Sequence, residues 1–585
     1  MTAFTSSAPS RSSLSRAGLL VGTLVLALVW LIPGLTGHDP WKQDEAYSFG
    51  IIWNMARTGD LVVPTLAADP FMEKPPAYYI TAAGLVRLLD GYLPAHDAAR
   101  LATGFYMALA LLFTGLLARA TWGPGQGAVG VILLISMAGL LVSGHFMITD
   151  NALTAGMAMA YYGLLRARRD RWGGVWLGTG AGLAFMSKGL LGPGILGVSG
   201  LLLFLFRDWR SRTYFHSLGV AVLCALPWLL IWPTALYLRS PELFQLWFWD
   251  NNFGRFFGPD LFTLLFGEYD FGRYHGLSDL GPPVQPYFWL YTVAWVTFPV
   301  LPLAAWTLLN PLWNQGSSAF QNPGVRMALV VSMVGWGLLF GSQSGRDLYT
   351  LPLLPLLAVI AAGGLETLPR TLVRIGYWLS LGLFGLTSLI LWGFWLYGIG
   401  VGHPPHWAWL GTFLSLDYEF TFDRRALLIA LAMQIAWALA LLRWRPPRTA
   451  ALLAWPLGVT LAWGLTITLH LPWIEQARTY RGVFTAMRAA LPDQFNCLAD
   501  YKVQPLRECE RGILHYVTGI TTEHVDSPAA TRCDFFLTET NLRARGTAID
   551  IGPGWQLIWQ GSLPPVHRDL FSLFRREPAI QEAGP

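Results

Sequence analysis

The first long apolar run of the chain, AGLLVGTLVLALVWLIPGL at residues 17–35, decides the class of fold. It contains no charged residue, and its length is close to the roughly 20 mostly apolar residues that a helix needs to cross the ~30 Å hydrocarbon core of a membrane. We expect a retained membrane span rather than a cleaved signal peptide, because no cleavage site of small residues accompanies it.

Similar runs recur along most of the chain and predict about thirteen crossings. They lie at residues 17–35, 98–119, 127–144, 151–165, 173–189, 192–206, 216–235, 287–308, 325–341, 351–364, 375–397, 425–442 and 450–470. The glycines of the fifth run, Gly178, Gly180 and Gly182, are typical of close helix packing and not of a phosphate-binding loop.

The composition agrees with a multispanning membrane protein. Of 585 residues, 54% are hydrophobic and only 13% are charged, with a mean hydropathy of +0.43, whereas soluble domains carry about 25% charged residues. The 28 Trp, 20 Tyr and 33 Phe residues are typical of many membrane–water interfaces. These numbers exclude a disordered chain and a fibrous repeat. They also exclude a nucleic-acid binder, although the net charge is +5.

Arginines in the short connections predict the orientation, because such residues stay on the cytoplasmic side. If the N-terminus is cytoplasmic, most of these arginines lie on the cytoplasmic side. They are Arg11, Arg16, Arg166, Arg168, Arg169, Arg171, Arg207, Arg210, Arg212, Arg370, Arg374, Arg443, Arg445 and Arg448. Arg424 and Arg425 fall on the other side. The external segments are then 36–97, 236–286, 398–424 and the chain from about 475 onward.

The sequence divides into a transmembrane domain at 1–474, with external loops 36–97 and 236–286, and an external domain at 475–585. The second domain combines strand-like runs with a helix-like stretch near 480–491, so we expect an α/β fold. It holds Cys497, Cys509 and Cys533, and an oxidising location permits one disulfide. Cys497–Cys509 is one pairing, but the sequence does not choose the pair.

Ionisable residues gather on the external side. Asp44 and Glu45 open a stretch, 44–58, that is predicted to be a helix in the membrane interface. Adjacent helical residues point about 100° apart, so only one of this pair enters a given site. Asp150 lies at the junction of the third and fourth spans, on the same side. Helix capping is the alternative for each aspartate, but ionisable residues at a membrane are costly and favour a functional interpretation.

The stretch Phe71-Met72-Glu73-Lys74-Pro75-Pro76-Ala77-Tyr78-Tyr79 predicts an anion site. The prolines place Lys74 just ahead of a helix N-terminus, where its charge and free backbone N–H groups suit a phosphate. A lysine that reaches the lipid headgroups is the alternative. Lys188, Arg255 and Arg346 share this face, and with Lys74 they predict a basic cavity rimmed by carboxylates. Such a cavity suits a substrate that is both a lipid and a phosphate diester.

Metal binding is a weaker hypothesis. Glu73 and His275 offer two separated ligands for a divalent cation, which is a weak signal compared with a clustered motif, and a solvated loop histidine is the alternative. No cofactor is otherwise indicated.

These elements, in this order, resemble the bacterial aminoarabinose lipid A transferases. That family belongs to the polyprenyl-phosphate-dependent membrane glycosyltransferases, which include the protein mannosyltransferases. The resemblance rests on Asp44-Glu45, on Glu73-Lys74-Pro75-Pro76 and on Thr149-Asp150. Ser187-Lys188-Gly189, an Asn-x-x-Arg-Phe element ending at Phe256 and an Arg-x-x-Tyr-x-x-Pro element starting at Arg346 complete the series.

The resemblance implies a helical membrane fold of the glycosyltransferase C type with a periplasmic domain, located in the bacterial inner membrane. It implies a polyprenyl-phosphate sugar as donor and lipid A or another envelope molecule as acceptor. Asp44 and Asp150 would be catalytic, with Glu45 and Tyr78 near the substrate. The donor phosphate would be bound by Lys74, Lys188, Arg255, Arg346 and Tyr349. A metal held by Glu73 and a loop histidine is also implied, although the spacing after His275 is longer than the family pattern.

Two alternatives to aminoarabinose transfer remain open. One is transfer of another sugar, such as a hexose, to a protein or a surface glycan. The other is a flippase or transporter of lipid-linked sugar. Transporters usually show internal repeats and polar residues near the bilayer midplane, whereas here no repeat is visible and the charges gather at one surface.

Overall fold

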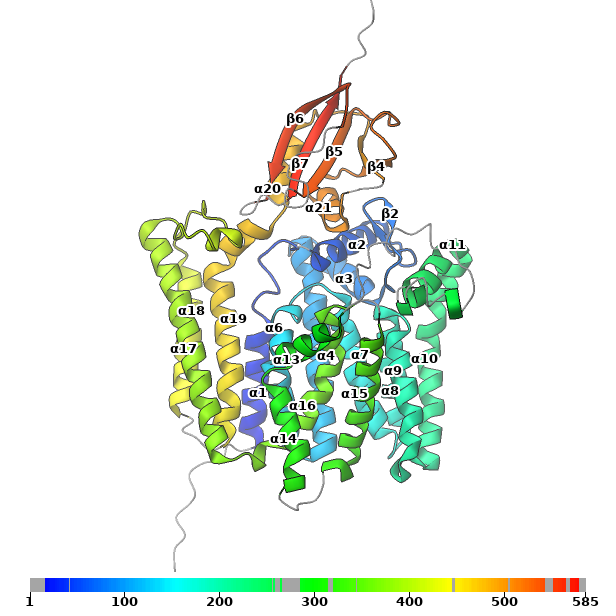
Figure 1. Ribbon diagram of the computed structural model, residues 1–585, viewed down its shortest axis with the longest axis vertical. Coiled ribbons are helices and arrows are strands. Elements are labelled where there is room, and N and C mark those ends of the chain that lie inside the picture. The colour runs from blue at the N-terminus through cyan, green and yellow to red at the C-terminus, as the bar shows by residue number, and fades with distance from the viewer. Residues whose placement is uncertain are drawn as a thin grey trace, which may run out of the picture.

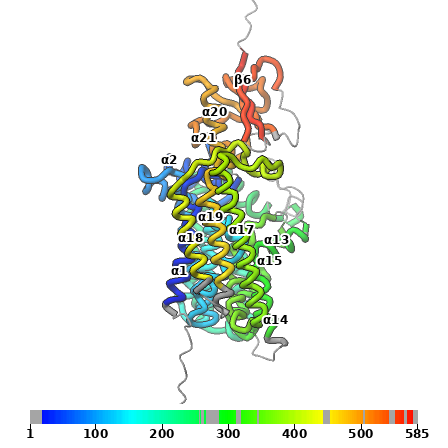
Figure 2. Tube along the Cα trace, turned by 90° about the vertical axis from the view of Figure 1, so that its left-hand side faces the viewer, coloured from blue at the N-terminus to red at the C-terminus, as the bar shows by residue number. Residues whose placement is uncertain are grey.

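The chain folds into a bundle of helices that carries a β-sheet at one end (Figures 1 and 2). The structure is a computed structural model. It describes residues 16–41, 43–254, 256–257, 263–265, 285–313, 319–342, 345–443, 448–502, 506–541, 551–563 and 569–577.

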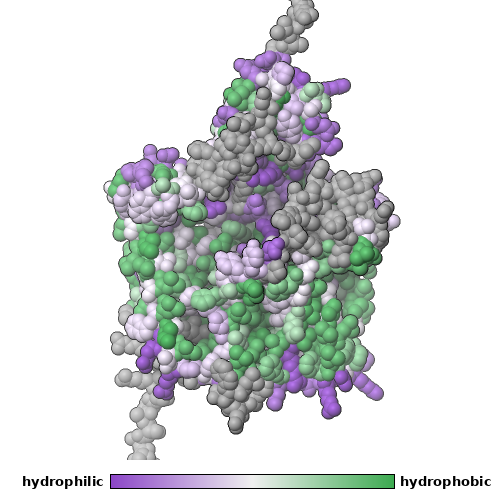
Figure 3. Space-filling view, viewed as in Figure 1, coloured by the Kyte–Doolittle hydropathy of each residue, from purple (hydrophilic) through white to green (hydrophobic). Residues whose placement is uncertain are grey.

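The apolar runs form the helices of the bundle. They are α1 (Arg16–Leu31), α4 (Ala95–Trp122), α5 (Gln126–Ser136), α6 (Ala138–Ser143), α7 (Thr149–Arg166), α8 (Trp172–Lys188), α9 (Leu191–Leu202), α10 (Arg212–Arg239), α11 (Pro241–Gln245), α13 (Pro286–Val296), α14 (Val300–Trp313), α15 (Pro323–Gly341), α16 (Leu354–Ala362), α17 (Arg370–Val401), α18 (Arg424–Arg443) and α19 (Arg448–Arg478). A broad hydrophobic band crosses the face of the bundle that Figure 3 shows.

The predicted thirteen spans are not confirmed. Among the described residues, six helices are long and apolar enough to cross a membrane, or seven if the bent pair α13–α14 counts as one span. The predicted run 287–308 is bent by 94° between these two helices, and the run 127–144 is split between α5 and α6. The hydropathy of a run reports its amino-acid composition and not the direction of the chain within it, so it does not reveal such breaks. The coarser prediction, a multi-pass helical membrane protein, is confirmed.

Two connections rich in arginine, between α7 and α8 and at residues 207–212, meet near the start of α15 at the end of the bundle opposite the sheet. Arg168, between α7 and α8, donates to the carbonyl of Asp208 at 3.2 Å, and Arg326 of α15 contacts the Asp208 carboxylate at 2.8 Å. Figure 3 shows hydrophilic side chains along this edge of the hydrophobic band. The gathering of these arginines agrees with the orientation that the sequence predicts.

Helices α7 and α8 pack through small residues, as the glycines of α8 predicted. A Cβ atom added to Gly180 would lie 2.5 Å from the backbone nitrogen of Ala160, and one added to Gly156 would lie 2.8 Å from that of Ala184. Such contacts require backbones in close approach. The two helices are antiparallel neighbours, so the start of α7, with Asp150, lies beside the end of α8, with Lys188.

The loop 36–97, which the sequence predicts to be external and which we call the first external loop, covers the end of the bundle nearest the sheet (Figure 1). It contains α2 (Asp44–Thr58), a hairpin of β1 (Thr65–Leu66) and β2 (Asp69–Pro70), and α3 (Ala77–Leu88). The predicted helix 44–58 is confirmed with the same bounds. It ends at Gly59, whose φ of 77° is a left-handed conformation that favours glycine.

The C-terminal region, residues 479–577, contains a five-stranded sheet in the order β4-β3-β5-β7-β6. Strand β3 pairs in parallel with β4 and β5, and β7 pairs antiparallel with β5 and β6. The elements are α20 (Arg481–Ala490), β3 (Leu498–Tyr501), α21 (Glu508–Thr518), β4 (Thr522–Val525), β5 (Phe535–Asn541), β6 (Trp555–Ser562) and β7 (Asp569–Arg576). The helix predicted near 480–491 is present as α20, and the strand-like runs predicted for this region include Phe535–Leu537 of β5 and Trp555–Ile558 of β6.

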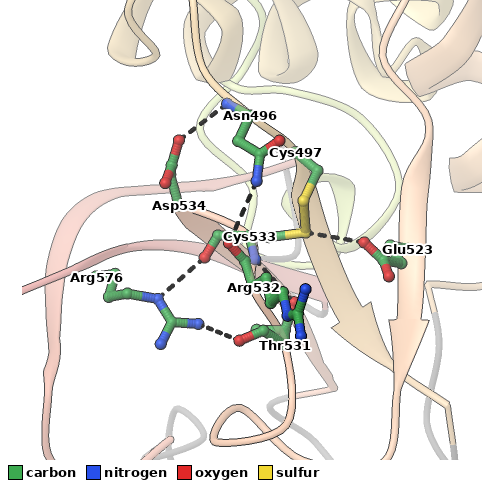
Figure 4. The surroundings of a disulfide bond; sticks show 8 residues. All are labelled: Asn496, Cys497, Glu523, Thr531, Arg532, Cys533, Asp534 and Arg576. Atoms are coloured by element: carbon green, nitrogen blue, oxygen red, sulfur yellow. Dashed lines mark hydrogen bonds between the residues drawn. A yellow bond between two sulfur atoms is a disulfide. The ribbon is translucent and has the colours of Figure 1, made fainter.

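The disulfide joins Cys497 to Cys533, so the pairing Cys497–Cys509 is wrong (Figure 4). Cys497 and Cys533 precede the neighbouring parallel strands β3 and β5, and this pairing brings their Cα atoms to 4.7 Å. Cys509 lies on α21, where its thiol is buried and is not part of the disulfide.

Candidate active site

A cavity of about 270 Å³ opens at the end of the bundle that the first external loop covers. Five charged residues line it, and they come from four separate parts of the chain: Glu73, Lys74, Asp150, Lys188 and Arg346. Aromatic and apolar residues form much of the remaining wall, among them Phe253, Phe256, Phe257, Leu338, Leu339 and Tyr349. The predicted basic cavity rimmed by carboxylates is therefore found, and it joins residues that lie up to 273 positions apart.

Asp44 and Arg346 form a bidentate ion pair at the rim of this cavity. The two terminal nitrogens of Arg346 contact the two carboxylate oxygens, one of them at 2.8 Å. Tyr47, one helical turn after Asp44, donates its hydroxyl to the same carboxylate at 2.8 Å. Lys74 donates to the Tyr47 hydroxyl at 2.5 Å, and its Nζ lies 5.0 Å from the centre of the tyrosine ring. Tyr47 thus links Lys74 to Asp44.

The surroundings of Asp44 keep its carboxylate ionised. Burial opposes ionisation, but the positive charges of Lys74 and Arg346 and the hydrogen bonds from Arg346 and Tyr47 outweigh it, and the pKa of Asp44 falls to about 2. Burial and the nearby carboxylates of Asp44 and Glu73 raise the pKa of Tyr47 well above its usual value. The phenol therefore keeps the proton that it donates to Asp44.

Asp150 and Lys188 form a second ion pair inside the cavity. The ammonium of Lys188 contacts Oδ1 of Asp150, and the exposed fractions of the two side chains are 14% and 4%. The same ammonium lies 4.1 Å from the centre of the Tyr349 ring, a favourable cation–π position. Close packing of α7 on α8 brings this pair together.

The turn after Lys188 is held by Asn252, an asparagine from the second predicted external segment, 236–286. Gly189 has a φ of 71°, and a Cβ there would lie 2.0 Å from Oδ1 of Asn252, so this position requires glycine. The same oxygen accepts a hydrogen bond from the backbone of Leu190 at 3.2 Å. Asn252 belongs to a π-helical turn, Leu246–Gly254, an arrangement that is frequent at functional sites.

Glu45 and Tyr78 are not among the residues that line the cavity, and their place near the substrate stays a prediction. Glu45 is 1% exposed and accepts a hydrogen bond from Arg100, itself 0% exposed, at 2.8 Å. Tyr78 is also buried, and its hydroxyl lies 2.7 Å from that of Thr103. For Glu45, helical geometry explains why it lies away from the cavity that Asp44 borders, because neighbouring positions on α2 point in different directions.

The metal hypothesis remains a prediction. Glu73 lines the cavity and lies 3.8 Å from Lys74, but its predicted partner His275 lies outside the described residues, as does Arg255. Within the described ranges, groups of three possible metal ligands occur in the C-terminal region and not at the cavity. One of them includes the disulfide cysteines Cys497 and Cys533.

Sequence reasoning missed Tyr47 and the role of Asn252. Tyr47 lies three residues after Asp44 in a predicted helix, and that spacing places the two on one face. The spacing is the signal that could have identified it. Nothing in the sequence indicates that Asn252 closes the turn after Lys188, because the two segments are 62 residues apart.

Comparison with known proteins identifies the relatives of this chain. The family model "Dolichyl-phosphate-mannose-protein mannosyltransferase" matches residues 73–232. An undecaprenyl phosphate-α-4-amino-4-deoxy-L-arabinose arabinosyl transferase of Pseudomonas fluorescens is 29% identical over 43% of this chain and 44% of its own length. The enzyme of the same name from Pectobacterium atrosepticum is 29% identical over 67% of each chain. This chain is similar in sequence to the bacterial aminoarabinose transferases.

The resemblance predicted from the sequence is therefore confirmed. The matched region of the Pseudomonas fluorescens relative is less than half of that protein. The fold, in contrast, matches over nearly the whole chain. ArnT from Cupriavidus metallidurans, in a crystal structure bound to undecaprenyl phosphate, has a TM-score of 0.63 at 17% identity, with 98% of this chain and 100% of that chain covered. At this identity the likeness shows the same fold.

Proposed function

We propose that this protein is an inverting glycosyltransferase of the bacterial inner membrane. It transfers 4-amino-4-deoxy-L-arabinose from undecaprenyl phosphate to a phosphate of lipid A, at a site that faces the periplasm. The observation that carries the proposal is the convergence of Lys74, Lys188 and Arg346 with two carboxylates on one external cavity. The names of the relatives supply the sugar and the lipid carrier. Residues 1–474 are the transmembrane domain and residues 475–585 a periplasmic α/β domain.

The cations of the cavity bind the donor phosphate in this proposal. Arg346 contacts Asp44, and Lys74 contacts Tyr47. Arg255, which lies outside the described residues, is a further phosphate-binding residue in this proposal. Breaking the bond between the sugar C1 and the phosphate oxygen leaves negative charge on the departing polyprenyl phosphate. Fixed cations stabilise that charge in the transition state, and each well-placed donor is worth about 3–4 kcal/mol.

An apolar cavity of about 410 Å³ supports a lipid substrate. It lies between α8, α10 and the 244–248 segment, and Leu190 lines both this cavity and the charged one. Its other walls are Phe185, Leu229, Leu230, Pro233, Thr234, Tyr237, Phe244, Trp247 and Phe248. We assign it to the first isoprenoid units of the donor, because apolar chains bind to apolar walls and the phosphate then reaches the cations.

The state of Asp44 favours a phosphate acceptor over a hydroxyl acceptor. A general base is most effective when its pKa lies near the operating pH, but the pKa of Asp44 is about 2. The phosphate of lipid A is already ionised and needs no proton removed. Asp44 then orients Arg346 and the acceptor, and Asp150 holds the amine or hydroxyl groups of the sugar. A single in-line displacement inverts the configuration at C1.

A metal ion bound through Glu73 would supply further positive charge beside the donor phosphate. The steps above do not depend on that ion, since the cations of the chain itself already converge on the cavity.

Two other functions would require different features of the site. The matched family model is named after protein mannosyltransferases, which transfer a hexose. Transfer of a hexose to a protein or glycan would require a base for the acceptor hydroxyl. A flippase would place its polar residues near the bilayer midplane, whereas the charged cavity here lies at one end of the bundle.

The proposal is tested by the choice of donor. Purified protein in detergent is supplied with lipid A and either undecaprenyl-phosphate aminoarabinose or an undecaprenyl-phosphate hexose, and the products are analysed by mass spectrometry. We expect lipid A to gain aminoarabinose. Hexose transfer alone would favour the first alternative. Movement of the lipid-linked sugar across vesicles, without transfer, would favour the flippase.

A further inference from the structure

The hairpin β1–β2 leads directly into the segment that carries Glu73 and Lys74. The backbone of Phe71 donates to the carbonyl of Pro64 at 2.7 Å and closes the hairpin. Asn54 of α2 donates to the carbonyl of Ala67 at the hairpin turn at 2.6 Å. Because Lys74 is only four residues beyond the last hairpin residue, Pro70, any movement of the hairpin also moves the Lys74 backbone.

Two basic side chains of the C-terminal region hold this hairpin at Asp69. Arg511 of α21 contacts Oδ2 of Asp69 at 2.5 Å, and Nε2 of His524 in β4 lies 3.0 Å from the same oxygen. The other ring nitrogen of His524 contacts the buried carboxylate of Asp500 in β3. His524 thus bridges one carboxylate of the sheet and one of the membrane-associated loop.

Backbone packing supports the same junction. A Cβ added to Gly50 of α2 would lie 2.8 Å from the Cα of Gly512 in α21 and 2.6 Å from the side chain of Leu66 in β1. Leu66 is 0% exposed. The hairpin, α2 and α21 therefore form one closely packed unit that includes Asp44 at the start of α2.

We propose that the C-terminal region positions the Lys74 segment for the donor phosphate through the ion pairs of Arg511 and His524 with Asp69. Arg511, His524 and Asp69 are positioning residues, since they lie outside the cavity and act through Lys74. The physical reason is that transfer depends strongly on geometry, because a displacement of about 1 Å at a reacting centre can cost roughly 100-fold in rate. The inference rests on the proposed function, in which Lys74 binds the donor phosphate.

Protonation of His524 makes this junction sensitive to pH. Hydrogen bonds to Asp500 and Asp69 raise the pKa of His524 to about 9, against the smaller effects of burial and of the nearby Arg511. A raised pKa means that the stabilisation is fully present below the unfolded value of 6.5 and is lost as the pH rises through about 9. We therefore expect the hairpin to be held firmly at neutral pH and less firmly in alkali.

The test is the binding of undecaprenyl phosphate to the full-length protein, titrated in detergent at pH 7 and pH 10. Asp69→Asn should weaken binding at pH 7 by roughly threefold to tenfold. His524→Gln should weaken it at pH 7 and remove most of the difference between pH 7 and pH 10. The matched control is Asp526→Asn, which removes an exposed ion pair with Lys502 in the same region and should leave binding unchanged.

Hydrogen exchange of the same proteins separates positioning from loss of the fold. In Asp69→Asn, the amides of residues 65–74 should exchange faster while those of β5 and β7 stay protected. The inference is overturned if wild type binds undecaprenyl phosphate and Asp69→Asn binds it equally well, or if residues 65–74 exchange at the wild-type rate in that variant. No binding by wild type would instead contradict the proposed function, and the exchange result would still decide whether the hairpin is held by Asp69.

Discussion

Arg346 holds the carboxylate of Asp44 with both of its terminal nitrogens, although the two residues are 302 positions apart in the chain. The pair joins the first external loop to the segment between α15 and α16, and so fixes two walls of the cavity relative to each other. Bidentate arginine–carboxylate contacts define geometry as well as charge. This contact lowers the pKa of Asp44 and fixes the orientation of its carboxylate.

Asp44→Asn should nearly abolish sugar transfer. The amide keeps the shape of the side chain but loses the charge that orients Arg346, and we expect kcat to fall by about 100-fold. Undecaprenyl phosphate should still bind, because Lys74 and Arg346 remain. Steady-state transfer assays and binding titrations measure the two effects. Asp347→Asn, at the residue next to Arg346, is the control and should retain most activity.

The same ion pair should contribute to stability in a pH-dependent way. The pKa of Asp44 is lowered from 3.8 to about 2, so its contribution is present above pH 4 and is lost as the pH falls toward 2. A shift of this size corresponds to about 2 kcal/mol in the free energy of unfolding. Thermal unfolding in detergent between pH 5 and pH 2 should show a smaller loss of stability for Asp44→Asn than for wild type. Equal losses would contradict the assigned charge state.

Substitutions of Lys188 and Asp150 should have strongly non-additive effects on the free energy of unfolding. Both side chains are largely buried, and removal of one partner leaves an uncompensated charge at a cost of about 3–5 kcal/mol. Lys188→Met should therefore destabilise the protein by several kcal/mol. The double variant Lys188→Met with Asp150→Asn should regain much of that stability but remain inactive. A double-mutant cycle on the unfolding free energies measures this coupling, and additive effects would argue against the pair.

Much of the site was predictable from the sequence, because its residues are charged and lie at the ends of predicted membrane spans or in the loops beside them. Lys74, Lys188 and Arg346 stood out for this reason, and the structure brings them to one cavity. Their mutual contacts were not predictable, since Asp44–Arg346 and Lys74–Tyr47 join segments that are distant in the chain. The bounds of α2 followed from local signals, an acidic first turn and the glycine after its end.

Other features depend on tertiary structure that hydropathy does not report. The bend between α13 and α14 lies within a continuous apolar run. The environment of Glu45 depends on Arg100 of α4, 55 residues away, and the choice of Cys533 as the partner of Cys497 depends on the order of strands in the sheet. Each of these requires knowledge of which elements are neighbours in space.

The disulfide should stabilise the C-terminal region. Cys497 and Cys533 are separated by 36 residues, and removal of such a crosslink typically costs about 2–5 kcal/mol. Cys533→Ser should therefore lower the protection of β3 and β5 amides in hydrogen exchange. Cys509→Ser changes a buried thiol on α21 that is not part of the disulfide, and it serves as the control. If both variants lost the same protection, the disulfide would not be the cause.

We propose that the sugar is transferred in the charged cavity to an acceptor that is already an anion. The most direct measurement compares intact lipid A with enzymatically dephosphorylated lipid A as acceptors for purified protein and undecaprenyl-phosphate aminoarabinose, with products resolved by mass spectrometry. We predict that only the phosphorylated lipid gains the sugar. Equal transfer to both lipids, or transfer only to a hydroxyl of the dephosphorylated lipid, would contradict the account.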